Sequence, residues 1–154
     1  MAPPSLLIDS CVPNVNQPLN PLPHSSGVPA TPFDAMGGED AVRRLVDRFY
    51  DLMDLEPGYA ELRASHGTTL DDARQKLFWF LCGWLGGPQH YQERFGHPRL
   101  RMRHMPFKIG ILERDQWLAC MDQAMRETDV HPDLRLRLQQ SFFQTADWMR
   151  NSPA

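Results

Sequence analysis

Apolar side chains recur every three or four residues through four long segments of this chain, and this periodicity constrains the fold more than any other feature. The segments cover residues 37–53, 68–88, 113–128 and 131–151. Spacing of this kind gathers apolar residues on one face of a helix. Alternation of apolar and polar residues, which is typical of a half-buried strand, is not evident. The pattern therefore predicts an all-α protein with about four long helices around one core.

Residues with special backbone preferences suggest where these helices begin and end. Thr69 is a candidate N-cap, with Asp72 at the spacing of a capping box. Pro132 suits the first position of the last helix, and Asp133 suits its first turn. The run Gly86-Gly87-Pro88 predicts the end of the second long helix.

Residues 1–32 differ in composition from the rest of the chain. They are rich in proline, serine and asparagine, and their apolar residues are too scattered to form a buried face. We predict a disordered, proline-rich leader at 1–32 and one globular domain at 33–154. A proline-rich docking segment is the alternative, although no PxxP motif with flanking cations stands out.

Charge, hydropathy and cysteine content argue against several functional classes. The formal net charge of −3 provides no basic patch for nucleic acid. No apolar run approaches the roughly 18 residues of a membrane span. Cys11, Cys82 and Cys120 show no CxxC spacing, which makes a disulfide framework or zinc knuckle unexpected. We expect a cytoplasmic protein with reduced thiols, in which Cys82 and Cys120 fill small core positions.

Histidine provides the candidate ligands and bases, but no catalytic pattern accompanies it. The six histidines are His24, His66, His90, His97, His104 and His131. Within "GHPRLRMRHMPFKIG", His104 follows Arg99, Arg101 and Arg103. Guanidinium groups beside an imidazole suit a molecule such as haem, with carboxylates on its rim and a metal at its centre. The alternative is that these arginines form a solvated face and that His104 is structural.

Three ordered stretches carry a resemblance to a known family. "RFYDLM", "FLCGWLGGPQHYQERFGHPRLRMRHMPFKIG" and "ERDQWLACM" closely resemble group II truncated haemoglobins, and the similarity extends over about residues 33–151. The resemblance implies a shortened globin, in which two antiparallel helix pairs form a two-over-two sandwich around one haem.

The same resemblance assigns the two faces of the haem. It implies that His104 is the proximal iron ligand, and that His97 either caps or braces the start of the proximal segment or approaches a propionate. On the distal face it implies that Tyr50 and Trp117 donate hydrogen bonds to bound oxygen, and that His66 is a third donor. The alternatives are a rim aromatic for Tyr50 and an exposed turn residue for His66.

The remaining haem contacts are also implied by the family pattern. Ala73 and Leu77 occupy the positions where many globins have a distal histidine and its apolar neighbour. Arg101 or Arg103 would bind a propionate, with Tyr91 as a further candidate. Candidates for packing on the haem faces, which could equally be ordinary core residues, are Phe80, Trp84, Phe107, Ile109, Met121 and Met125.

These residues predict haem b as cofactor and O2, CO, NO or peroxide as ligand. The first functional hypothesis is reversible binding of diatomic ligands for storage or sensing, because several hydrogen-bond donors oppose the rapid release that bulk oxygen transport requires. The second is peroxidase-like or nitric oxide dioxygenase chemistry, with an external reductase because the sequence shows no flavin or NAD segment. The third is a haem-free helical interaction module. A monomer or a homodimer is compatible with all three.

Overall fold

The computed structural model describes residues 31–151, and these residues form helices and connecting loops without a β-strand. The elements in chain order are α2 (Pro32–Met36), α3 (Glu39–Leu55), the 3-10 turn η1 (Pro57–Tyr59), α4 (Ala60–Ala64), α5 (Asp71–Trp84), α6 (His90–Phe95), α7 (Leu100–His104), α8 (Ile111–Glu127) and α9 (Pro132–Trp148). The four longest, α3, α5, α8 and α9, are the four helices that the periodicity predicts. Almost all of the predicted leader lies outside the described residues.

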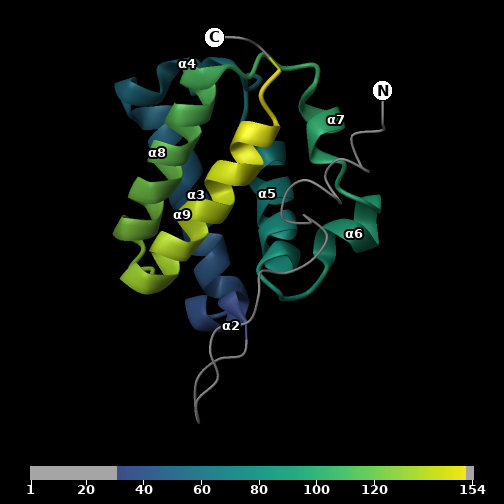
Figure 1. The fold of residues 1–154 in the computed structure, drawn as a ribbon, viewed down its shortest axis with the longest axis vertical. Coiled ribbons are helices and arrows are strands. Elements are labelled where there is room, and N and C mark those ends of the chain that lie inside the picture. The colour runs from purple at the N-terminus through teal and green to yellow at the C-terminus, as the bar shows by residue number, and fades with distance from the viewer. Residues whose placement is uncertain (1–30, 152–154) are drawn as a thin grey trace.

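The four long helices pack against one another in a continuous series. α3 contacts both α5 and α8, and α8 contacts α9. Figure 1 shows α8 and α9 side by side, and α5 lies beyond α9 with α6 packed against it. Within the described part of the chain, no helix is long and apolar enough to span a membrane.

The core consists of the apolar faces that the sequence pattern indicates. Phe49, Leu81, Met125 and Leu138, one from each long helix, are fully buried. Burial of each such side chain contributes roughly 1.5–3 kcal/mol to stability. The core also contains Cys120, whose thiol donates to the Phe49 carbonyl oxygen at 3.2 Å and whose pKa is raised by burial to about 12. A protonated, buried thiol of this kind is a packing residue, as the sequence suggests.

Aromatic rings connect the long helices through the core. The Phe49 and Trp117 ring centroids lie 5.2 Å apart, and those of Trp117 and Phe142 lie 5.4 Å apart. Phe142 in turn stacks on Trp84 at 4.9 Å. Because these residues come from α3, α8, α9 and α5, a displacement of any one helix disturbs the contacts of the others.

One predicted helix start is confirmed and another is wrong. Pro132 opens α9, and the His131 side chain accepts a hydrogen bond from the Asp133 backbone amide. In contrast, α5 begins at Asp71, so Thr69 is not its N-cap and the predicted capping box does not form. Leu70 is buried in the core and takes the N-cap position instead. Thr69 still supports this end, because its hydroxyl accepts from the Asp71 amide at 3.2 Å.

α6 and α7 are short because the chain changes direction between them. Gly96 ends α6 with a positive φ of 75°, a conformation that glycine adopts without a steric penalty. α7 follows as a single short helix that has no buried residue. Met102, Met105 and Phe107, in and just after α7, are between 45% and 51% exposed. The segment from α7 to Phe107 therefore presents apolar side chains that the described part of the chain leaves about half exposed.

Candidate functional site

His104, the last residue of α7, has one ring nitrogen fixed by the backbone. Its Nδ1 lies 2.7 Å from the Leu100 carbonyl oxygen. A carbonyl can only accept, so Nδ1 carries the proton and Nε2 has a free lone pair. Burial lowers the pKa of His104; the Leu100 hydrogen bond acts in the opposite direction, and the electrostatic influence of the nearby His66 acts in the same direction as burial. The neutral imidazole is thus favoured, and this is the form that binds a metal ion.

The surroundings of His104 suit haem. A single imidazole lone pair is the donor set that haem iron requires, since the macrocycle supplies the other four ligands. A hydrogen bond from the second ring nitrogen to a carbonyl is the usual support for such a ligand. The exposed apolar residues Met102, Met105 and Phe107 lie within three positions of His104 and could cover an apolar macrocycle. The residues present therefore fit the cofactor.

Tyr50 is a buried hydroxyl donor on α3. Its ring packs edge to face against Phe49 at 4.9 Å and against His66 at 6.1 Å. Burial raises the pKa of Tyr50 well above its ordinary value, and the nearby Arg74 charge only partly opposes this shift. The hydroxyl stays protonated and can donate a hydrogen bond at any ordinary pH.

His66 lies in the turn after α4, and its ring is fixed in the same way as that of His104. Its Nδ1 is 3.0 Å from the Leu62 carbonyl oxygen, so Nδ1 carries the proton. Burial lowers the pKa of His66 despite that hydrogen bond, and the Arg63 charge lowers it as well. Neutral His66 therefore presents Nε2 as an acceptor. This differs from the expectation that His66 adds a third donor.

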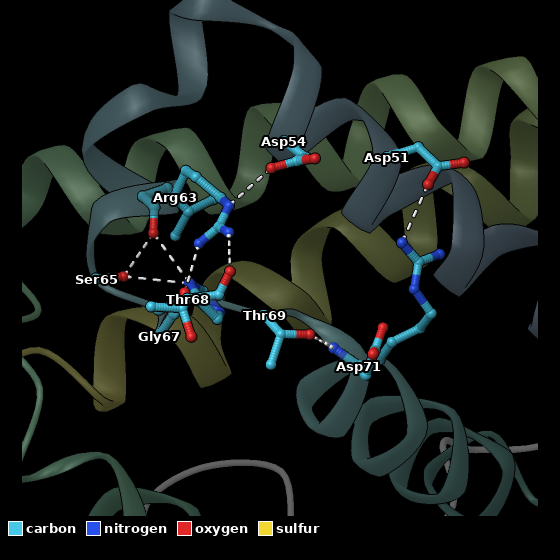
Figure 2. A network of polar contacts seen from close by, with 11 residues as sticks. Asp51, Asp54, Arg63, Ser65, Gly67, Thr68, Thr69 and Asp71 are labelled. Carbon is cyan, nitrogen blue, oxygen red and sulfur yellow. Dashed lines mark hydrogen bonds and ion pairs between the residues drawn. The ribbon is translucent and has the colours of Figure 1, made fainter.

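Arg63 holds the loop that carries His66, and Figure 2 shows its contacts on both sides, with Asp54 and with Gly67 and Thr68. Its Nε donates to Asp54 at the end of α3, at 2.9 Å. Its Nη1 and Nη2 donate to the carbonyl oxygens of Gly67 and Thr68 at 2.8 and 3.1 Å. One side chain thus ties α4, the end of α3 and the loop before α5 together. Sequence analysis missed Arg63, because nothing in "ELRASHG" indicates partners on both sides of the arginine.

Trp117 on α8 is far from Phe49 in the sequence but packs against its ring. The two ring centroids lie 5.2 Å apart. Its side chain is half-buried, and its indole N–H can only donate. Tyr50 and Trp117 therefore both pack on Phe49, and Tyr50 also contacts His66. The structure thus connects the three predicted distal residues in series, with Trp117 and Tyr50 on Phe49 and His66 on Tyr50.

The two arginines considered for propionates have partners in the protein. Arg101 donates from Nε to the Trp148 carbonyl oxygen at 3.0 Å and from Nη2 to that of Arg150 at 3.4 Å. Arg103 donates from Nε to a carbonyl of the preceding loop at 2.8 Å, and its guanidinium lies 5.8 Å from the Tyr91 ring centroid. Arg101 is therefore directed toward the end of α9, whereas Arg103 and Tyr91 form a pair beside α7.

The apolar candidates fall into groups by burial. Those partly accessible are Ala73, Leu77, Phe80 and Ile109, whereas Phe107 is exposed and Trp84, Met121 and Met125 are buried in the core. Trp84 stacks on Phe142, which places its ring among the core aromatics.

His97 supports the start of α7. Its Nδ1 accepts a hydrogen bond from the Arg99 amide at 3.0 Å.

Comparisons with known proteins agree on one family. The family model described as bacterial-like globin matches residues 31–151. Group 2 truncated hemoglobin YjbI from Bacillus subtilis is 38% identical over 104 residues, which cover 68% of this chain and 76% of that protein.

Solved structures show the same similarity. The group II 2-on-2 hemoglobin from Agrobacterium tumefaciens is 42% identical, with a TM-score of 0.78, and the match covers 82% of this chain and 98% of that chain. The truncated oxygen-avid haemoglobin from Bacillus subtilis is 36% identical, with a TM-score of 0.72 over 79% of this chain and 99% of that chain. These matches confirm the predicted all-α, two-over-two fold. The chain belongs to the bacterial-like globins and, within them, to the group II truncated haemoglobins.

Proposed function

We propose that this globin binds haem b through His104 and holds O2, CO or NO in a polar distal pocket, for ligand storage or O2- and NO-related redox chemistry rather than bulk transport. One observation carries the proposal. The Leu100 hydrogen bond leaves the Nε2 lone pair of His104 open, and His66, which helps to lower the pKa of His104, packs edge to face against the donor Tyr50 at 6.1 Å. A metal-ligating imidazole and a group of polar side chains therefore border the same region.

The chain's own residues would hold the cofactor on its proximal side. His104 supplies the axial nitrogen, and its hydrogen bond to the Leu100 carbonyl fixes the ring. Arg103 and Tyr91 suit a propionate, and Arg101 is a further candidate. When bound, haem supplies an iron atom that takes a diatomic ligand and exchanges electrons. Ala73, Leu77, Phe80, Phe107 and Ile109 would shield that site from water.

The distal residues determine how long a ligand stays. Tyr50 and Trp117 can each donate a hydrogen bond to a polar diatomic ligand, which slows its release. Ala73 is too small to close the pocket, so polar stabilisation depends on these donors. A related structure described as an oxygen-avid haemoglobin, which is 36% identical to this chain, supports this part of the proposal.

A second function, peroxidase-like or nitric oxide dioxygenase chemistry with an external reductase, is favoured by His66. Its Nε2 lone pair and lowered pKa suit a group that accepts a proton from peroxide. The two functions differ in kinetics. A storage protein releases oxygen slowly and turns peroxide over poorly, whereas an enzyme consumes peroxide or NO at a rate that depends on His66.

Expression with haem supplementation tests the proposal directly. The wild-type protein is expected to show a Soret band, and His104→Ala is expected to lose or weaken haem retention. His131→Asn is the matched control, because asparagine preserves the N-cap of α9 at a position outside the site. A colourless wild-type protein, or a His104→Ala protein that retains haem as well as wild type, contradicts the assignment.

A further inference from the structure

Asn151 makes four hydrogen bonds to the segment that begins at His104. Its Nδ2 donates to the Phe107 carbonyl oxygen at 2.7 Å and to the His104 carbonyl oxygen at 3.3 Å. Its Oδ1 accepts from the Ile109 amide at 2.9 Å, and its own amide donates to the Ile109 carbonyl oxygen at 2.9 Å. Figure 1 shows the chain after α9 reaching the loop that joins α7 to α8.

Arg101 strengthens the same connection from the α7 side. Its Nε and Nη2 donate to the carbonyl oxygens of Trp148 and Arg150. Its guanidinium carbon also lies 5.4 Å from the Trp148 ring centroid. We call Arg101 together with residues 148–151 the C-terminal clasp. The clasp joins α7 to the end of α9, which has its own anchor in the core through Phe142.

The clasp matters because α7 has little other support. None of its five residues is buried. The carbonyl groups in the last turn of any helix lack partners within the helix, and a helix this short has few bonds of its own. The His104 carbonyl oxygen accepts from the Phe107 amide at 3.0 Å, and Asn151 supplies a second donor to it and one to the Phe107 carbonyl, so it holds the backbone of the residue whose imidazole is to bind iron.

We propose that Asn151 is a positioning residue for His104, which sets the orientation of the proximal imidazole through the two bonds donated by Nδ2. This inference rests on the proposed function, in which His104 is the axial ligand. Groups that orient a metal ligand typically change metal affinity by about 10- to 100-fold when they are removed. The amide of Asn151 suits this task because it combines donors for two carbonyls with an acceptor for one amide.

Two substitutions separate positioning from simple attachment of the loop. Asn151→Asp keeps the Oδ1 acceptor for the Ile109 amide but replaces the donors to the His104 and Phe107 carbonyls with a second acceptor. Asn151→Ala removes all side-chain bonds. Gln144→Ala, at an exposed position of α9, is the control.

The measurements are the iron–histidine stretching band of the ferrous protein by resonance Raman spectroscopy and the rate of haem transfer to an acceptor apoprotein. Both Asn151 variants are expected to shift or broaden the band and to speed haem transfer about 10-fold, whereas Gln144→Ala matches wild type. A lower thermal midpoint with an unchanged band shows a purely structural role and overturns the proposal. An Asn151→Asp protein that matches wild type in both measurements also overturns it.

Haem binding by the wild-type protein and the positioning role of Asn151 can be tested separately. If the wild-type protein shows no Soret band, the proposed function fails and this inference fails with it. If wild type binds haem through His104 and both Asn151 variants keep its Raman band, the proposed function stands and only the positioning role is rejected.

Discussion

Tyr50 and His66 lie edge to face, with their ring centroids 6.1 Å apart, and they offer opposite hydrogen-bonding groups. Burial keeps the Tyr50 hydroxyl protonated and therefore able to donate. The bond from Nδ1 to the Leu62 carbonyl leaves neutral His66 with an acceptor at Nε2. In the proposed distal pocket a ligand would thus meet Tyr50 as a donor and His66 as an acceptor, and protonation of His66 would turn that acceptor into a further donor.

Ligand release should therefore depend on pH through His66. Burial holds the pKa of His66 below the ordinary histidine value, so the neutral ring is favoured near neutral pH and gains a proton at Nε2 as the pH falls through the lowered pKa. The additional donor is expected to slow oxygen release several-fold, since one hydrogen bond contributes about 1 kcal/mol. Stopped-flow measurements from pH 8 to pH 5 check this. His66→Phe should remove the pH dependence, and an identical pH profile in that variant would show that another group is responsible.

Removal of a distal donor should speed oxygen release at constant pH. Tyr50→Phe deletes one donor with little change in ring volume, Trp117→Phe deletes one donor and leaves a smaller aromatic ring, and each is expected to raise the dissociation rate about 10-fold. Tyr59→Phe is the matched control, because the Tyr59 hydroxyl donates to Gln123 Oε1 at 2.7 Å and is not among the proposed distal groups. Flash photolysis or stopped-flow mixing measures the rates. Unchanged release in both pocket variants contradicts a polar distal pocket.

The long helices could be predicted because each has a local signal. Apolar periodicity is present in α3, α5, α8 and α9, and the Pro132 start of α9 follows from proline's backbone preference. The start of α5 could not be predicted, since burial of Leu70 is a property of the assembled core. Local capping preference favoured Thr69 as the N-cap of α5, but packing of Leu70 in the core moved the start of the helix to Asp71.

The residues that form the proposed site could be predicted from the sequence, whereas the residue that holds His104 in place could not. Family resemblance pointed to Tyr50, His66, Trp117 and His104 because short motifs carry them. Asn151 and its partner His104 are far apart in the sequence, and neither "WMRN" nor the His104 motif indicates their contact. The tautomer of each histidine also depends on carbonyl positions, which only the folded helices define.

Arg63 should control the mobility of the loop that carries His66. Arg63→Ala removes bonds to Asp54 and to two loop carbonyls, and the free energy of local opening is expected to fall by about 2 kcal/mol. Hydrogen exchange of residues 65–70 measures the effect. Arg63→Lys retains a charge for Asp54 and should give an intermediate result, and Arg48→Ala, which removes the surface pair with Glu127, is the control. Equal exchange in wild type and Arg63→Ala would rule out this role.

Phe142 should contribute strongly to stability because it connects the core to the distal residues. It is 4% exposed and contacts Trp84 at 4.9 Å and Trp117 at 5.4 Å. Phe142→Ala is expected to lower the free energy of unfolding by about 3–5 kcal/mol, since it removes a buried ring and leaves a cavity. The neighbouring Phe143 is 46% exposed, and Phe143→Ala should cost less than about 1 kcal/mol. Urea unfolding followed by tryptophan fluorescence compares the two. Similar losses in both variants would show that burial does not distinguish these adjacent rings.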